Sequence, residues 1–403
     1  MGISLLGVTL AAQVIVSPGG PVPTLTEALR VVPRGGTITV TAGTYREPTI
    51  VIQRPVTITG QGEPVFDGEG ARQILVIAAD SVTVQGLVLA NVGTSFVEDR
   101  SAIRVEQARD CVLRNNRIEG GFFGIYLASA AHCLIEHNTL VGAGGREAVA
   151  GNGIHLWYSR DVEIRDNRIT GHRDGIYFEF VENSQVVGNL SRGNFRYGLH
   201  FMFSDGCAYR DNEFRANGAG VAVMYTTNVI MTGNRFVENW GSAAFGLLLK
   251  EITDSDVSGN EFRGNTVALM AEGSNRVHVR NNEFVGNGWA VKVMANASDN
   301  QFTGNNFSRN TFDVATNSRR AYSTFTGNYW DAYTGYDLDR DGVGDVPHRP
   351  VRLFALMVER HPPALVLLRS VFVQLMDTAE RVVPSLTPEA LADHSPRMRP
   401  VAR

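Results

Sequence analysis

Apolar and polar residues alternate with a period of two over short stretches that recur along most of the chain. In residues 161–167, for example, Val162 and Ile164 alternate with Glu163 and Arg165. Such alternation is typical of a β-strand that has one face against a core. A second kind of strand follows a turn, with apolar pairs such as Leu199 and Phe201 in the inward positions.

An asparagine marks the turn between the two kinds of strand, and its position repeats along the chain. The turn residues are Asn116, Asn138, Asn167, Asn189, Asn212, Asn234, Asn260, Asn282, Asn305 and Asn328, so subtraction gives spacings of 22 to 29 residues. This period, with no helical stretch inside a coil, excludes leucine-rich and ankyrin repeats and indicates a β-solenoid. We therefore predict an all-β fold, a right-handed parallel β-helix, with the handedness taken from the general rule for parallel connections.

The recurring asparagines have an expected physical role. Stacked side-chain amides can hydrogen-bond in a ladder along the coil axis. Asparagine also tolerates the left-handed backbone conformation that a sharp corner requires, so we expect the turn asparagines to adopt it.

The remaining segments give the boundaries of the predicted parts. A helix capped by Thr24 is expected over residues 24–30, where it would plug one end of the coil. Residues 351–383 indicate two helices interrupted by His361, Pro362 and Pro363. The tail, residues 384–403, is expected to be extended and mobile unless a partner holds it. The predicted parts are residues 1–13, a possible export-signal remnant or first strand; 14–330, the β-helix; 331–350, an acidic loop; and 351–403, a helical docking or capping segment with its tail.

Composition excludes some classes of function. Lys and Arg number 37 against 41 Asp and Glu, which gives a net charge of -4 and no basic footprint for nucleic acid. No apolar run reaches the roughly 18 to 20 residues of a membrane span.

Three cysteines, Cys111, Cys133 and Cys207, each lie five residues before a turn asparagine. This is the inward slot that Val162 occupies in another coil, so core packing is the expected role. Cys111 and Cys133 are on successive coils, where the strand spacing also permits a disulfide.

Outward positions of the second strand carry the candidate chemistry. Aligning the coils places Met202 beside Met224, with His200 two residues before Met202 and Glu179 one coil away. Thioether and imidazole are the ligands that Cu(I) prefers. We therefore predict a copper site at His200, Met202, Met224 and Glu179, with His155 as a reserve ligand two coils from His200. Tyr177, between His155 and His200, is expected to frame the site.

A structural interpretation of the same residues stays open. The alignment also places Met270 in the outer column with Met224, and methionines on the flank of a solenoid are often covered by loops or by a partner. The long insertions near residues 142–151 and 240–244 are candidates for such a cover.

Residues 337–345 form a second candidate metal site. Their acidic side chains are Asp337, Asp339, Asp341 and Asp345, and a glycine stands at the sixth position, as in calcium loops. The twelfth position is His348, where an EF-hand has a glutamate. Two interpretations of this loop stay open: a calcium site with a structural role, and a solvated acidic turn.

No catalytic group is predicted. A β-helix lyase or glycosidase requires paired carboxylates or a basic group in a cleft, whereas Glu179 is nearly alone on its column. The alternative to a copper protein is a carbohydrate-active or polysaccharide-binding β-helix protein, which fold alone does not establish.

Two stretches resemble a known family. Residues 327–347, which include Asn328-Tyr329-Trp330-Asp331 and the acidic loop, together with 363–370, are similar to the NosD family of nitrous oxide reductase maturation proteins. Residues 26–29 and 43–45 and the Asn-turn coils match as well, so the similarity covers nearly the whole chain.

The resemblance implies a periplasmic β-helix protein, peripherally associated with the inner membrane through an ABC transporter made of a permease and an ATPase. It also implies a role in supplying copper to nitrous oxide reductase, with a copper chaperone lipoprotein as the donor. The residues 365–376 are too short an apolar stretch to cross a bilayer but suit a partner's groove. A cap on the end of the coil is the alternative role for this segment.

Overall fold

The structure is a computed structural model that describes residues 13–95, 97–318, 322–383, 387 and 391–402. The chain divides into two compact units, residues 1–168 and 169–403. The proposed export-signal remnant falls on residues 1–12 and the start of the first strand, and residues 1–12 lie outside the described part.

The first unit is a parallel β-helix whose strands form three sheets, called A, B and C here. Sheet A contains β1 (Gln13–Val16), β2 (Thr37–Thr41), β5 (Val56–Gln61), β8 (Val82–Gln85), β11 (Val112–Arg114), β14 (Leu134–Glu136) and β17 (Glu163–Arg165). Sheet B contains β3 (Thr44–Tyr45), β6 (Val65–Asp67), β9 (Val88–Ala90), β12 (Arg117–Gly121) and β15 (Thr139–Gly142). Sheet C contains β4 (Ile50–Ile52), β7 (Leu75–Ile77), β10 (Ser101–Glu106), β13 (Phe123–Ala128) and β16 (Ile154–Trp157).

Helix α1 (Leu25–Val31) begins at Thr24, whose side chain accepts a hydrogen bond from the backbone N–H of Glu27. It buries Leu25, Ala28 and Leu29 and contacts β1, β2 and β4, so it covers the first coil as predicted. A short 3₁₀ helix, η1 (Glu147–Val149), lies in the insertion before β16.

The second unit repeats the same three sheets. Sheet A contains β20 (Gln185–Val187), β23 (Ala208–Arg210), β26 (Ile230–Thr232), β29 (Asp256–Ser258), β32 (His278–Arg280), β35 (Ser298–Thr303) and β38 (Tyr322–Thr326). Sheet B contains β18 (Arg168–Thr170), β21 (Leu190–Arg192), β24 (Glu213–Arg215), β27 (Arg235–Val237), β30 (Glu261–Arg263), β33 (Glu283–Val285), β36 (Asn306–Ser308) and β39 (Tyr329–Trp330). Sheet C contains β19 (Asp174–Glu179), β22 (Tyr197–Met202), β25 (Ala219–Met224), β28 (Phe245–Lys250), β31 (Val267–Glu272), β34 (Trp289–Val293) and β37 (Phe312–Ala315). The all-β, parallel β-helix prediction is confirmed.

The inside of the second unit is filled by stacked aromatic rings. Phe236, Phe262 and Phe284 stack at centroid distances of 4.6 and 4.8 Å, and the stack continues to Phe307 and Trp330. Each ring comes from the same position of successive sheet B strands, so in-register parallel pairing places them face to face. The three cysteines, Cys111, Cys133 and Cys207, are buried and free, as expected for core packing.

The predicted asparagine ladder is present in both units. In the second unit, for example, the Asn212 backbone N–H and side-chain amide both donate to Oδ1 of Asn234, at 3.1 and 3.0 Å. The expected left-handed conformation is on a different residue, however. It belongs to the residue before each ladder asparagine, such as Asn115 (φ 53°) and Asp211 (φ 56°). The ladder asparagine directs its side-chain amide inward, and the residue before it forms the corner of the coil.

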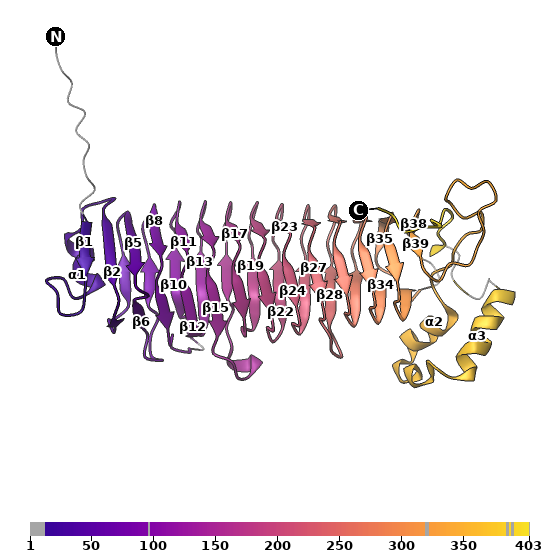
Figure 1. Cartoon of the computed structure of the whole chain (residues 1–403), viewed down its shortest axis with the longest axis horizontal. Coiled ribbons are helices and arrows are strands. Elements are labelled where there is room, and N and C mark those ends of the chain that lie inside the picture. Colours follow the sequence, from indigo (N-terminus) through magenta and orange to yellow (C-terminus); the bar gives the residue numbers. More distant parts are fainter. Residues whose placement is uncertain (1–12, 96, 319–321, 384–386, 388–390, 403) are drawn as a thin grey trace, which may run out of the picture. The chain divides into compact units, whose positions relative to one another are not determined.

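The C-terminal segment packs against the second unit. Helix α2 (Leu353–Arg360), the 3₁₀ helix η2 (Pro362–Leu367) and α3 (Val371–Val382) agree with two helices broken at His361. Phe354 and Val358 are buried against Trp289 and Phe312 of sheet C, so these helices cover the flank of the last coils (Figure 1).

The end of the tail is fixed and does not extend freely, contrary to the expectation for this segment. Leu391, Ala392 and Asp393 are buried, and Asp393 accepts hydrogen bonds from the last ladder residue, Asn328. The predicted mobile tail is therefore wrong for residues 391–402, which pack beside the last coil.

Candidate metal site

Sheet C of the second unit brings the predicted copper ligands onto one patch. Parallel pairing places Glu179 opposite Met202 and Met202 opposite Met224 on the neighbouring strands β19, β22 and β25. His200 is on β22, two residues before Met202, so both side chains leave the same face of the strand. The patch of Glu179, His200, Met202 and Met224 is called the thioether patch below.

His200 has a fixed orientation. Only 4% of its surface is exposed, and its ring contacts Tyr177 and Tyr197 at centroid distances of 5.0 and 4.7 Å. Its Nδ1 lies 3.8 Å from a carboxylate oxygen of Asp174, whereas its Nε2 is buried and has no hydrogen-bond partner among the described residues. The carboxylate is beyond hydrogen-bond distance of Nδ1, and Nη2 of Arg196 lies 3.5 Å from the same nitrogen. The buried Nε2 is therefore the ring nitrogen that could bind a metal.

The carboxylate behind His200 is held by an arginine. Nε of Arg196 donates to Asp174 at 2.9 Å, and the backbone N–H of Tyr197 donates to the same carboxylate at 3.2 Å. Burial raises the pKa of Asp174, but the interactions with Arg196 and His200 outweigh it and leave the pKa lowered. Asp174 is therefore ionised at neutral pH and keeps His200 in place.

The two thioethers are half-buried, and Met202 is hydrogen-bonded. The hydroxyl of Tyr177 donates to the sulfur of Met202 at 3.5 Å. Burial, and then the nearby charge of Glu179, raises the pKa of Tyr177 to about 12, so its hydroxyl remains protonated as a donor. Soft sulfur, one imidazole nitrogen and one carboxylate together suit Cu(I) better than a hard cation.

One sequence assignment changes with the structure. Met270 is opposite Leu248 and Lys292, which puts it in the column of His200 and outside the outer column of Met224. Met270 packs under the C-terminal helices, so it has the covered role that the structural interpretation describes. On the neighbouring strand β28, the residue opposite Met224 is Lys250. Its positively charged side chain bounds the thioether patch on that side.

His155, the reserve ligand, is on β16 of the first unit. Its Nδ1 lies 3.1 Å from the side-chain nitrogen of Asn152, and its ring packs against Phe123 and Tyr126. His155 is not part of the patch that the second unit forms by itself.

The acidic loop clusters three of its predicted ligands. Asp337, Asp339 and Asp341 place ligand oxygens within 4.8 Å of one another, and no other group of three His, Cys, Asp or Glu side chains in the described chain does so. Oδ1 of Asp337 is buried without a partner there. Asp345 instead accepts the backbone N–H of Leu338 at 2.7 Å, so it closes the loop.

Sequence reasoning named Tyr177 as framing the site but missed its contact with the sulfur of Met202, and it missed Asp174 beside His200. The signal for Asp174 is its place at the start of β19, opposite Tyr197 in the register. Within the described residues no helix is long and apolar enough to cross a membrane.

Comparison with known proteins gives the family. The family model for NosD, described as a periplasmic copper-binding protein, matches residues 143–335. The chain is 30% identical over 379 residues to a probable ABC transporter binding protein NosD of Pseudomonas aeruginosa, covering 89% of this chain and 87% of that protein. A protein of the same description from Stutzerimonas stutzeri is 28% identical over 378 residues, covering 89% and 86%.

Among solved structures, the A-module of mannuronan C-5 epimerase AlgE4 from Azotobacter vinelandii has a TM-score of 0.51 at 18% identity, over 73% of this chain and 86% of the module. This likeness concerns the fold alone. The fold thus defines a parallel β-helix protein. The chain belongs to the NosD family.

Proposed function

We propose that this chain is a periplasmic accessory protein that binds Cu(I) as cargo and supplies it for nitrous oxide reductase maturation, working with an ABC transporter. The observation that carries the proposal is the pairing of Met202 with Met224, next to a buried His200 whose Nε2 has no partner among the described residues. The family description and the names of its relatives support copper and a transporter partner. Donation by a copper chaperone lipoprotein is part of the same proposal.

The patch is suited to a transported ion. Thioethers bind Cu(I) without requiring a proton to leave, and a half-buried site protects the ion while a partner can still reach it. Transfer then exchanges ligands and leaves the oxidation state of copper unchanged.

The experiment measures Cu(I) bound by the full chain in competition with a chromogenic Cu(I) chelator. We expect about one tight equivalent, lost when Met202→Leu and Met224→Leu are combined, since leucine keeps the volume and removes the sulfur. Met270→Leu is the matched control, because this methionine lies under the C-terminal helices and outside the patch. Copper uptake that survives the double substitution would disprove the site.

The transporter partner is proposed to bind the C-terminal helices. Val371, Leu375 and Val382 are 69%, 63% and 76% exposed on α3, while α2 is fixed to β34 by the ion pair of Lys292 and Glu359 at 2.7 Å. The C-terminal helices cover the flank of the last coils, but this apolar face of α3 remains exposed. An exposed apolar face suits binding by a membrane permease. The ATPase of the transporter would lie on the other side of the membrane.

Val371→Ser with Leu375→Ser tests this surface. A truncation after Pro350 is unsuitable, because it also removes Asp393, which binds the last coil. We expect the double substitution to abolish co-purification with the permease and to leave Cu(I) binding intact. Ser substitution of Val31, an exposed residue of α1 in the first unit, is the control.

We also propose that the acidic loop binds calcium in a structural role. The clustered oxygens of Asp337, Asp339 and Asp341 and the buried, unpartnered Oδ1 of Asp337 support it. The loop connects the last coil to the C-terminal helices, so a bound ion would fix that connection.

A further inference from the structure

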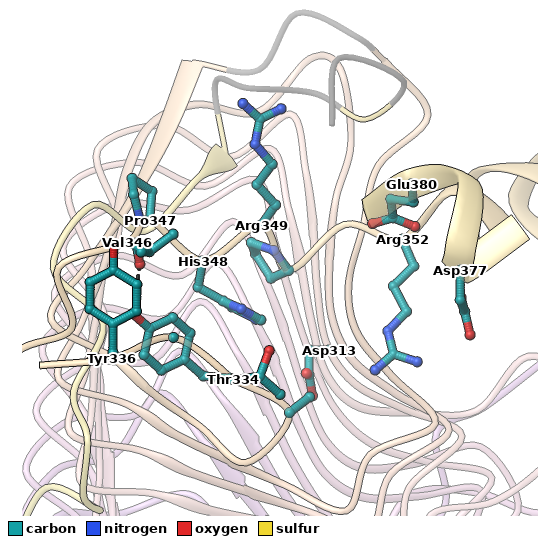
Figure 2. A pocket seen from close by; sticks show the side chains of 14 residues that line it. Asp313, Thr334, Tyr336, Val346, Pro347, His348, Arg349, Arg352, Asp377 and Glu380 are labelled. Carbon is teal, nitrogen blue, oxygen red and sulfur yellow. Dashed lines mark hydrogen bonds between the residues drawn. The ribbon is translucent and has the colours of Figure 1, made fainter. Parts of the chain in front are cut away.

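A cavity of about 670 Å³ opens between the last coils and helix α3 (Figure 2). Asp313 of β37 lines one side, Asp377 and Glu380 of α3 line another, and the segment 346–352 contributes His348 and Arg352. His348 lies within the segment 331–350, but none of these residues belongs to the thioether patch or to the proposed calcium ligands Asp337, Asp339 and Asp341. The copper and calcium proposals therefore leave the cavity unassigned.

His348 gives the cavity a neutral hydrogen-bonding group. Its ring packs on Trp330 at 5.0 Å and against the edge of Tyr333 at 5.7 Å. Burial lowers the pKa of His348 to about 4, so the ring is uncharged at neutral pH. Its Nε2 is buried and has no hydrogen-bond partner among the described residues. Such a nitrogen carries a desolvation cost that a bound polar group would remove.

The carboxylates of the cavity are also incompletely paired. Asp313 accepts one hydrogen bond at 3.3 Å from the side-chain nitrogen of Asn310, and burial raises its pKa to about 6. Glu380 accepts the backbone N–H of Leu353 at 3.0 Å, and burial raises its pKa as well. Asp377 stands one turn before Glu380 on the same helix.

Arg352 lies among these groups without contacting them. Its charge lowers the pKa of Asp313, of Glu380 and of His348, so it is near all three. Even so, none of the ion pairs within 4.0 Å among the described residues includes Arg352. Figure 2 shows its side chain extending into the cavity between Asp313 and Asp377. A guanidinium separated from carboxylates by a gap is complementary to a ligand that carries both charges.

We propose that this cavity binds a small zwitterion, whose oxyanion pairs with Arg352 and whose ammonium group is held by Asp377 and Glu380. The planar guanidinium binds a phosphate or carboxylate group through two hydrogen bonds. A simple anion would meet the carboxylates of α3, and a simple cation would meet Arg352, so each is bound less well. Phosphoethanolamine has the required chemistry, either as a free solute or as the headgroup of a phospholipid.

The first experiment is a calorimetric titration of the full chain with O-phosphoethanolamine at neutral pH. We expect saturable binding, and binding of inorganic phosphate or of ethanolamine alone that is weaker by about tenfold or more. Phosphoethanolamine that does not bind, or inorganic phosphate that binds equally well, would overturn the proposal.

Variants then locate the site. Arg352→Gln and, independently, Asp377→Asn are expected to weaken phosphoethanolamine binding by about tenfold. Arg360→Gln is the matched control, because Arg360 is an exposed arginine at the end of α2 and does not line the cavity. Unchanged binding in both cavity variants would assign the ligand elsewhere and refute the proposal. Cu(I) uptake by Arg352→Gln should equal that of the unsubstituted chain, which separates this site from the copper site.

Vesicles identify the source of the zwitterion. Retention of the chain on phosphatidylethanolamine vesicles, but not on phosphatidylcholine vesicles, and its loss in Arg352→Gln would assign the site to a lipid headgroup. Binding of the soluble compound without vesicle retention would assign it to a free solute. Both outcomes support a zwitterion site, whereas vesicle retention that Arg352→Gln does not change would count against it.

Discussion

The hydroxyl of Tyr177 donates a hydrogen bond to the sulfur of Met202 at 3.5 Å, across neighbouring strands of sheet C. One lone pair of a proposed copper ligand is therefore engaged when no ion is bound. Copper must compete for this sulfur or bind through its other lone pair. In the proposed copper site, we therefore expect Tyr177 to modulate the affinity for the ion.

Tyr177→Phe is expected to tighten Cu(I) binding by about two- to tenfold, the range that corresponds to one modest hydrogen bond. Phenylalanine retains the ring that packs on His200 at 5.0 Å, so the imidazole keeps its position. The dissociation constant from chelator competition gives the result. Weaker binding in this variant would show that the hydroxyl holds the sulfur in its binding position and does not compete with copper.

Asp393 ends the asparagine ladder of the second unit. Its carboxylate accepts hydrogen bonds from the backbone N–H groups of Gly327 and Asn328, the side-chain amide of Asn328 and the indole of Trp330, at 2.9 to 3.1 Å. The tail thus supplies the oxygen that the next coil would otherwise supply.

Asp393→Ala should destabilise the last coils by about 3 kcal/mol or more, because it leaves several buried donors without an acceptor. Denaturant unfolding followed by tryptophan fluorescence is a direct measurement, since Trp330 is buried at this point. His394→Ala, at an exposed neighbour, is the control. Equal stability of the two variants would mean that solvent replaces the carboxylate.

The coil could be predicted from the sequence because parallel in-register stacking repeats the same residue types at the same positions. The structure also contains a second ladder, which the first period does not predict and which runs through Asn194, Asn217, Asn239, Asn265, Asn287 and Asn310. Each of its members follows a first-ladder asparagine by five residues, and this spacing was the available signal.

The site was predictable only as far as strand alternation reaches. Counting along strands placed Met202 opposite Met224, because their coils are of regular length. It misplaced Met270 by two residues on β31, because Val267, Leu269 and Ala271 alternate in a run that fits more than one register, and Leu269 is the residue opposite Leu247. Periodicity does not give contacts that depend on side-chain direction, such as that of Asp174 with His200. It also does not give contacts made by the returning tail, such as those of Asp393.

Calcium should stabilise the chain through the acidic loop. The backbone amide of Asp341 lowers the pKa of Asp339, but the neighbouring carboxylates outweigh it and leave this pKa raised, which shows repulsion that a cation would relieve. We expect calcium to raise the thermal unfolding midpoint of the unsubstituted chain. The increase should disappear when Asp339→Asn and Asp341→Asn are combined, and remain in Asp299→Asn, a control at an aspartate outside the loop. An equal calcium effect in all three proteins would show that the ion binds elsewhere.

Asp313 and His348 should make opposite contributions to the pH dependence of stability. The pKa of Asp313 is raised from 3.8 to about 6, so the folded state binds the extra proton and stability falls as pH rises through this interval. The pKa of His348 is lowered from 6.5 to about 4, so the unfolded state binds the extra proton and stability rises over nearly the same interval. The two effects largely cancel in the unsubstituted chain.

Single substitutions should reveal each slope. As pH rises, and relative to the unsubstituted chain, Asp313→Asn should gain roughly 3 kcal/mol of stability between pH 4 and 6, and His348→Gln should lose a similar amount between pH 4 and 6.5. Denaturant midpoints at both ends of each interval measure these differences. Parallel profiles for the two variants would contradict the assignment, because the predicted proton uptake has opposite signs at the two residues.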